Sequence, residues 1–599
     1  MRKNYDAIII GTGAAGYSAA DWLFKAGITN IAVISENRLS GTSRNTGSDK
    51  QTYYKISMDG KSEDSPYRMA EDICSLGCCD GEKAYKQAIN SAKCFLRLCD
   101  YGMDFPRNEF GGYPGYKTDH DNTSRATSVG PLTSKMMTRV LEKRVLEANK
   151  TPLLDNRQVI KIITDKNHVH GVVVLNKETN KAETIAAKNV IAATGAPACI
   201  YKNSVFPESQ HGMTGVLIEA GVKLCNFTQW QYGLASTDFR WNVSGSFMQV
   251  IPRVVSIDEN GNETEFLKNH FKSVNDALDN VFLKGYQWPF SFDRIPYSSR
   301  VDVAVHEEIK AGKNVYLDFT RNPEGYDFHS LSDEAKDYLS ANGATAGTPI
   351  ERLKILNSKA IDVYLRQGID LYTQNLKIAV CAQHNNGGIH TDSNYETCIK
   401  GLYVIGEAAG SFGLTRPGGS ALNDTQVGGL VCAEHIKNSI FEDVSNDVID
   451  EAKNNINSLI ENFSIDKNTD YSLIPKKMSD VASFIRDKDG CAALLLAING
   501  ILSDYPLSHN SISKYFYDWD MLISAKALLE TILGEMPFTG SRGGSVFISD
   551  GKIIEENTDY RKFLTISDGG KTYFEETKPI PKSDKPFEYY LNQISEREI

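Results

Sequence analysis

Residues 5–36 read "YDAIIIGTGAAGYSAADWLFKAGITNIAVISE" and predict a strand, a helix and a second strand. The three isoleucines at 8–10 form the continuous apolar run that is typical of a strand buried on both faces. Gly11, Gly13 and Gly16 then complete the pattern G-x-G-x-x-G. The first glycine permits a tight turn, the second lets the backbone approach a pyrophosphate, and the third lets the helix pack close to the strand. The stretch therefore predicts a dinucleotide-binding βαβ unit.

An acidic residue stands where such a unit needs one. The second predicted strand, "NIAVISE" (30–36), ends in Glu36, which follows Gly16 by 20 residues. A carboxylate at this distance is suited to bind the hydroxyl groups of a ribose. A lone glycine motif is a weak signal, but its place between a strand and a helix, with this acid beyond it, favours a nucleotide site strongly.

Two distant segments resemble returning strands of the same domain. "NVIAATGAPA" (189–198) ends near Thr-Gly, and "GLYVIGEAAG" (401–410) ends near Gly-Glu before a helical run. A site assembled from such separated strands indicates FAD rather than NAD, because simple NAD dehydrogenases do not need them. The predicted cofactor-binding residues are Gly11, Gly13, Ala14, Ala15, Gly16, Glu36, Asn45, Thr46, Thr194, Gly195, Gly406, Glu407, Ser420, Ala421 and Leu422.

Composition excludes several classes of protein. The 599 residues carry a net charge of −11, without the basic face that a nucleic-acid partner requires. The longest clean apolar run, 492–498, is far shorter than a membrane span, and the N-terminus lacks the apolar core of a signal peptide. We expect a cytoplasmic protein with no membrane span. The 11 cysteines are expected to be free thiols, and no metal site is predicted from the grouped Cys74, Cys78 and Cys79.

Five further segments carry a family resemblance, in order along the chain. They are "HGMTGVLIEAGVKLCNFTQWQYG" (211–233), "SRVDVAVHEEIKAGKNVYLDFT" (299–320), "QHNNGGI" (383–389), "GLTRPGGSALND" (413–424) and "WDMLISAKALLETILGEMPFTGSRGG" (519–544). With the nucleotide motifs, they make the chain resemble the flavoprotein subunits of fumarate reductase, succinate dehydrogenase and L-aspartate oxidase. The resemblance covers most of the chain.

The resemblance implies an α/β fold with a Rossmann-like FAD-binding domain of the glutathione reductase type. An α+β capping domain is inserted into it, and a helical domain follows. We place the FAD-binding domain at 1–203 and 374–440, the capping domain at 204–373, the helical domain at 441–549 and an irregular tail at 550–599.

The same resemblance implies roles for three residues. Arg300 would transfer a proton, while His384 and Arg416 would hold one carboxylate of a substrate. A guanidinium group suits this task because its planar N–H groups recognise a carboxylate in a bidentate manner. Arg300 is followed by Val301, whereas the family has Arg-Asp, so Arg294 is the alternative donor. Without the flanking matches, His384 would be read as a residue that merely stabilises a turn.

The chain departs from the family at the second carboxylate site. Gln231 stands where the family has the histidine of Gln-x-His-Pro-Thr. This favours a monocarboxylate whose far end would contact Gln231, Trp230 and Tyr232. His120, in a polar loop (112–137), is a further candidate contact, although such loops are more often solvated.

No histidine precedes His120, and residues 44–46 are Arg-Asn-Thr where membrane-bound relatives carry a flavin-linking histidine. We therefore expect non-covalent FAD.

These features favour a fumarate reductase-like enoate reductase of anaerobic metabolism. It would reduce the C=C bond of an α,β-unsaturated carboxylate, with electrons from reduced flavin or a partner redox protein. Two alternatives stay open: an FAD-dependent dehydrogenase or oxidase of an amino acid, hydroxy acid or sugar, and a flavin electron-transfer subunit of a larger complex.

Overall fold

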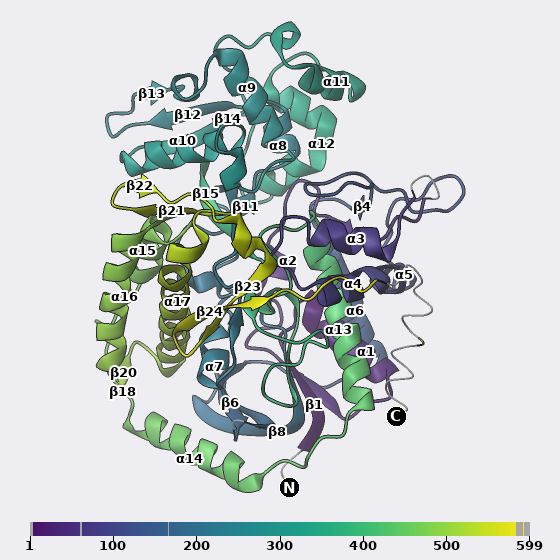
Figure 1. The fold of residues 1–599 in the computed structure, drawn as a ribbon, viewed down its shortest axis with the longest axis vertical. Helices are drawn as coiled ribbons and strands as arrows, with labels where there is room; N and C mark the ends of the chain where they lie inside the picture. The colour runs from purple at the N-terminus through teal and green to yellow at the C-terminus, as the bar shows by residue number, and fades with distance from the viewer. Residues whose placement is uncertain (1–3, 60–62, 166, 583–590, 592–599) are drawn as a thin grey trace.

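The computed structural model describes residues 4–59, 63–165, 167–582 and 591. A body built around a mostly parallel sheet lies below a lobe of helices and strands (Figure 1). The helices of the lobe are α8 (Ser246–Gln249), α9 (Val274–Leu283), α10 (Ser299–Lys310), α11 (Asp333–Ala341) and α12 (Pro349–Leu365).

The central sheet has seven strands in the order β5-β2-β1-β8-β7-β6, with β17 also paired to β8. Their bounds are β1 (Asn4–Ile10), β2 (Ile31–Ile34), β5 (Leu153–Leu154), β6 (Arg157–Thr164), β7 (Val169–Asn176), β8 (Lys181–Ala192) and β17 (Leu402–Val404). β1 pairs in parallel with β2 and β8, and β17 pairs in parallel with β8. Ile8 and Ile9 are fully buried, as the apolar run predicts. The carboxyl ends of β1, β8 and β17 therefore meet at one edge, although they are far apart in sequence.

Helices α1 (Ala14–Lys25) and α13 (Ser420–Asn438) pack together beside this sheet. A Cβ atom on Gly16 would lie 2.0 Å from the carbonyl oxygen of Gly11. Any residue other than glycine at position 16 would therefore clash, and glycine lets α1 approach β1 this closely. A Cβ atom on Gly429 would lie 2.8 Å from the nitrogen of Ala19. Small residues thus let α1 pack close to β1 and α13 pack close to α1. The helices α3 (Pro66–Ile73), α4 (Gly81–Ile89), α5 (Ser91–Asp100) and α6 (Thr133–Lys143) lie near them (Figure 1).

A second sheet, of six strands, connects the lobe to the body. Its order is β11-β10-β15-β14-β12-β13. The bounds are β10 (Trp230–Ser236), β11 (Trp241–Asn242), β12 (Arg253–Ile257), β13 (Glu263–Thr264), β14 (Asn314–Asp318) and β15 (Leu376–Asn385). β15 pairs with β10 and β14, so residues 376–385 belong to this sheet, although the predicted boundary at 374 placed them in the FAD-binding domain.

The C-terminal third is helical before its last strands. It contains α14 (Asn446–Asn462), α15 (Leu473–Val481), α16 (Lys488–Ser503) and α17 (Ile512–Thr539). The tail adds a hairpin of β23 (Phe563–Asp568) and β24 (Lys571–Glu576), which pairs with β9 (Leu224–Cys225). Within the part of the chain that the structure describes, every helix is too short or too polar to cross a bilayer.

Candidate active site

One cavity of about 620 Å³ runs between the edge of the central sheet and the lobe. Its wall includes most of the residues expected to bind the cofactor: Gly11, Gly13, Ala14, Ala15, Glu36, Thr46, Thr194, Gly195, Gly406, Glu407, Ala421 and Leu422. They come from the first βαβ unit and from both returning segments. The tertiary structure therefore brings together in one wall groups that the sequence separates by about 400 residues.

The glycines of the turn between β1 and α1 leave the backbone at the start of α1 free to face the cavity. Gly11 has a φ of +115°, and a Cβ atom there would lie 2.4 Å from the carbonyl oxygen of Ala193. Gly13, at the N-cap of α1, offers no side-chain cap. Backbone N–H groups at a helix start favour an anion, so this end suits a pyrophosphate.

Three of the predicted cofactor residues lie off the wall and support it from behind. Gly16 contacts the backbone of Gly11, as described above. The side chain of Asn45 donates hydrogen bonds to the carbonyl oxygens of Leu39 and Gly41, both at 3.0 Å. The hydroxyl of Ser420 donates to the carbonyl oxygen of Pro417 at 2.7 Å. Gly16, Asn45 and Ser420 therefore shape the loops behind the wall and do not line the cavity.

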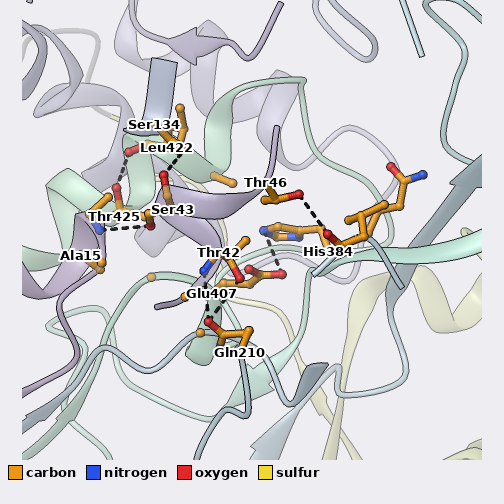
Figure 2. Close-up of a pocket in the computed structure, with 18 of the residues that line it drawn as sticks. Ala15, Thr42, Ser43, Thr46, Ser134, Gln210, His384, Glu407, Leu422 and Thr425 are labelled. Carbon is orange, nitrogen blue, oxygen red and sulfur yellow. Dashed lines mark hydrogen bonds and ion pairs between the residues drawn. The ribbon is translucent and has the colours of Figure 1, made fainter. Parts of the chain in front are cut away.

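Several polar wall residues were missed from the sequence. Figure 2 shows Thr42 facing Gln210, whose Nε2 atom donates to the carbonyl oxygen of Thr194 at 2.6 Å. Ser134 donates to the carbonyl oxygen of Ser43 at 2.8 Å (Figure 2). The hydroxyl-rich run "TSRNT" at 42–46 was the available signal, but nothing in it identifies Gln210 or Ser134 as neighbours.

His384, Arg416 and Glu407 meet at the other end of the cavity. Arg416 Nε donates to His384 Nδ1 at 3.3 Å, and His384 Nε2 lies 4.0 Å from Glu407 Oε1, which Figure 2 shows beside the ring. Burial, followed by the charge of Arg416, lowers the pKa of His384 well below its usual value. Burial raises the pKa of Glu407 to about 7 and lowers that of Arg416 to about 10. At neutral pH the imidazole is neutral and the guanidinium carries the charge.

Asp119 lies on the same wall, and its carboxylate binds a second arginine, Arg294, which lies behind the wall. Nη1 and Nη2 of Arg294 both donate to Asp119 Oδ1 at 3.1 Å. Burial would raise the pKa of Asp119, but the neighbouring His120 and Arg294 lower it overall, so the carboxylate is ionised. Arg294 itself is not part of the wall.

Arg300, predicted to be catalytic, lies outside the cavity wall, and its catalytic role stays a prediction. It occupies the first turn of α10, its side chain is 34% exposed, and it contacts His270 at 3.3 Å. His120 also lies off the wall, where Nε2 faces Asp119 Oδ2 at 3.2 Å.

The predicted substrate contacts on β10 also lie off the wall, and their role in substrate binding stays a prediction. Trp230, Gln231 and Tyr232 are buried in the protein interior and do not line the cavity. The hydroxyl of Tyr232 lies 2.9 Å from that of Tyr201. Gln231 pairs with His384 across the sheet, and the register shifts after it. Backbone pairing therefore brings Gln231 close to His384 without turning its side chain to the cavity.

The lobe closes the cavity with neutral and aromatic side chains. They are Asn242, Ser244, Gln249, Tyr286, Trp288, Tyr338 and Gln383. Asn242 donates to Gln383 Oε1 at 2.5 Å and accepts from the nitrogen of Ser244 at 2.7 Å. The amide groups are thus fixed by one another, and they bring no cation to this end.

Comparison with known proteins identifies the family. A model of the FAD binding domain matches residues 6–422, which is more than half of the chain. The chain belongs to the FAD binding domain family. The cavity described above lies within the region matched, apart from Asp424 and Thr425 and the residues that α17 contributes to its wall.

Proteins that are similar to this chain in sequence or structure confirm the resemblance and the fold. An uncharacterized FAD-dependent oxidoreductase of Methanocaldococcus jannaschii is 23% identical over 79% of this chain and 84% of its own length. L-aspartate oxidase of Synechocystis is 22% identical over 88% of this chain and 85% of its own. A structure of quinol fumarate reductase of E. coli superposes with a TM-score of 0.70 at 18% identity, and covers 98% of each chain.

The residues of this FAD binding domain fit the cofactor. Thr194 Oγ1 and Asn385 Nδ2 are buried without a hydrogen-bond partner among the described residues, although both residues line the cavity. Buried polar groups in proteins are almost always bonded, so these two atoms are available to a polar ligand. Together with the open helix start and Glu36, they match the pyrophosphate, ribose and ring system of FAD.

Proposed function

We propose that this oxidoreductase reduces the C=C bond of an α,β-unsaturated monocarboxylate. One observation carries the proposal: Arg416 is 9% exposed, lies on the cavity wall, and has no carboxylate within ion-pair distance among the described residues. A buried cation without a counter-ion is unfavourable unless a ligand supplies the anion. The substrate carboxylate fills that role.

The side chains that the lobe adds to the wall favour one carboxylate rather than two, since the other cations on the wall, Lys50, Lys117 and Arg157, come from outside the lobe. The nearby guanidinium of Arg294 is already neutralised by Asp119. The lobe presents amides, hydroxyls and aromatic rings. A second carboxylate that met only these lobe groups would lose its hydration without gaining a cation.

The residues of the chain supply orientation, a dry site and a proton, while bound FAD supplies the hydride. His384 and Arg416 fix the carboxylate, and the lobe excludes water, which strengthens each charge in the site. The Arg294–Asp119 pair is the proton-transferring group in this proposal. Because Asp119 is ionised, the proton comes from the guanidinium of Arg294: Asp119 accepts it and passes it to the substrate carbon at the wall. Arg294, whose side chain is 25% exposed, then regains a proton from solvent.

Non-covalent attachment of FAD is part of the proposal. Residues 44–46 contain no histidine, and Asn45 points away from the cavity. The histidines on the wall are His211 and His384, and Nδ1 of His384 is already engaged by Arg416. Acid precipitation of the protein should leave all of the flavin in the supernatant; flavin retained in the pellet would contradict this part.

The decisive experiment is anaerobic. Enzyme reduced by one equivalent of dithionite is mixed with fumarate, aryl acrylates and short aliphatic enoates, and flavin absorbance is followed. Rapid return of absorbance with one class of monocarboxylate is expected. Equal or faster reoxidation by fumarate would overturn the monocarboxylate assignment.

One feature supports a second function, the oxidation of an amino acid. The ionised carboxylate of Asp119 lies on the same wall as Arg416, so a substrate with both an ammonium and a carboxylate group meets an opposite charge at each. Bleaching of the oxidised flavin by an amino acid, with no reoxidation by any enoate, would favour this function over the first.

A further inference from the structure

The first turns of α17 reach the cofactor cavity from the helical region. Phe516, Tyr517 and Asp520 lie on its wall, beside Glu36 and His211. With Ser513, the three residues follow the spacing i, i+3, i+4, i+7, which places them on one face of the helix. A helix outside the region matched by the family model therefore forms part of the cofactor site.

Tyr517 and His211 hold the carboxylate of Glu36 from both sides. The hydroxyl of Tyr517 donates to Glu36 Oε2, and His211 Nδ1 lies 2.9 Å from Glu36 Oε1. The rings of Tyr517 and His211 stack with centroids 3.9 Å apart and an angle of 21° between their planes. Lys177 Nζ donates to the tyrosine hydroxyl at 3.3 Å. The carboxylate is thus fixed in one orientation by groups from three segments of the chain.

Contacts beside this cluster dock α17 onto the FAD-binding region. The helix runs close to α7 (Thr214–Glu219), as Figure 1 shows. A Cβ atom on Gly215 would lie 2.5 Å from the carbonyl oxygen of Asp520, so glycine is needed for this approach. Asp520 Oδ1 accepts from the nitrogen of Val216 at 2.9 Å, and Ser513 donates to Gln158 Oε1 at 2.7 Å. Val216 and Gln158 also line the cavity, so docking of the helix and shape of the site depend on the same residues.

We propose that α17 is a clamp for the adenosine end of FAD, in which Tyr517 and His211 position Glu36 for the ribose hydroxyls. A carboxylate already held in place loses little side-chain entropy on binding, which strengthens affinity. By linkage, docking of α17 strengthens FAD binding, and bound FAD stabilises the docked helix by the same free energy. The inference is independent of the substrate proposed above.

The first test measures release of FAD from the holoenzyme by the rise in flavin fluorescence after dilution. Tyr517→Phe removes one hydrogen bond to a carboxylate and should accelerate release about tenfold. Tyr515→Phe is the matched control, because Tyr515 lies on the same helix but packs against Phe463 and Tyr505 and is absent from the cavity wall. Equal release rates in the two variants would overturn the proposal.

A double-mutant cycle separates positioning from packing. In a Glu36→Gln background, Tyr517→Phe should change the release rate less than about twofold, because its partner is already altered. The full tenfold effect in both backgrounds would show that Tyr517 acts through packing alone, against the proposal.

Hydrogen exchange of the unaltered protein tests the linkage without any variant. Amides of residues 513–520 should exchange more slowly with FAD bound than after its removal, while amides of α14 should not change. Exchange in α17 that is indifferent to FAD would contradict the clamp.

Discussion

Two buried arginines show how differently the same side chain is used in this molecule. Arg125 is completely buried and donates hydrogen bonds to three carboxylates, those of Asp64, Asp72 and Asp121. Arg416 is almost as buried, but its described partners are the imidazole of His384 and the carbonyl oxygen of Pro417. The first cation makes direct ion pairs within the fold, whereas no described carboxylate lies within ion-pair distance of the second, on which Glu407 acts from further away.

This difference distinguishes an arginine that stabilises the fold, Arg125, from an arginine that is available to bind a ligand, Arg416. Several acids around one guanidinium fix the loops that carry them, and no ligand is needed. A guanidinium that faces a cavity with no acid in direct contact keeps its bidentate donors available for an anion. Burial alone therefore does not identify the functional arginine, whereas the absence of a direct ion pair among the described residues does.

The largest effect is expected from Arg125→Met. It leaves three carboxylates around an apolar side chain, so the free energy of unfolding should fall by about 3–5 kcal/mol. Urea unfolding of the holoenzyme measures this change. A variant as stable as the original protein would contradict this comparison, because Arg125 would then not contribute to the stability of the fold.

Arg416→Met should produce the opposite pattern. Loss of the anion-binding group should lower kcat/KM with the preferred enoate about a hundredfold or more, without lowering the free energy of unfolding. Reoxidation of the reduced flavin by molecular oxygen, which has no carboxylate, is the control and should not change. Equal losses with oxygen and enoate would place the defect in the cofactor site instead.

The two candidate proton donors can be compared directly. Arg294→Met removes the partner of Asp119 and should slow reduction of the enoate about a hundredfold, the range of a lost general acid. Arg300→Met changes a side chain that lies off the cavity wall, and should alter the rate less than about twofold. Single-turnover kinetics of both variants decide between them, and a larger loss at Arg300 would identify Arg300 as the proton donor.

The smallest effect concerns pH. Burial raises the pKa of Glu407 to about 7, so its carboxyl is neutral below that pH and negative above it. The negative form attracts Arg416 and repels a substrate carboxylate, so the KM for the enoate should rise, by about tenfold or less, between pH 6 and pH 8. Glu407→Gln should remove this dependence; a profile that stays the same in the variant would assign it to another group.

The residues at the nucleotide-binding end of the site could be predicted well from the local sequence. The glycine turn, Glu36, and the Thr-Gly and Gly-Glu strand ends all lie on one wall, because each depends on short-range backbone rules and on parallel strands ending at one edge. The residues at the substrate end of the site could not be predicted as well from the sequence. The alternation of β10 is interrupted by a register shift, so the side chains of Trp230, Gln231 and Tyr232 could not be placed on a face from their spacing.

Sequence by itself determined the family, the FAD cavity and the pairing of His384 with Arg416, since these rest on motifs whose residues are fixed by backbone geometry. Only the tertiary structure decided that Arg300 lies off the cavity wall, that Arg294 stands behind Asp119, and that α17 reaches Glu36. Each of these depends on how one packed element is rotated against another, which helical periodicity does not specify.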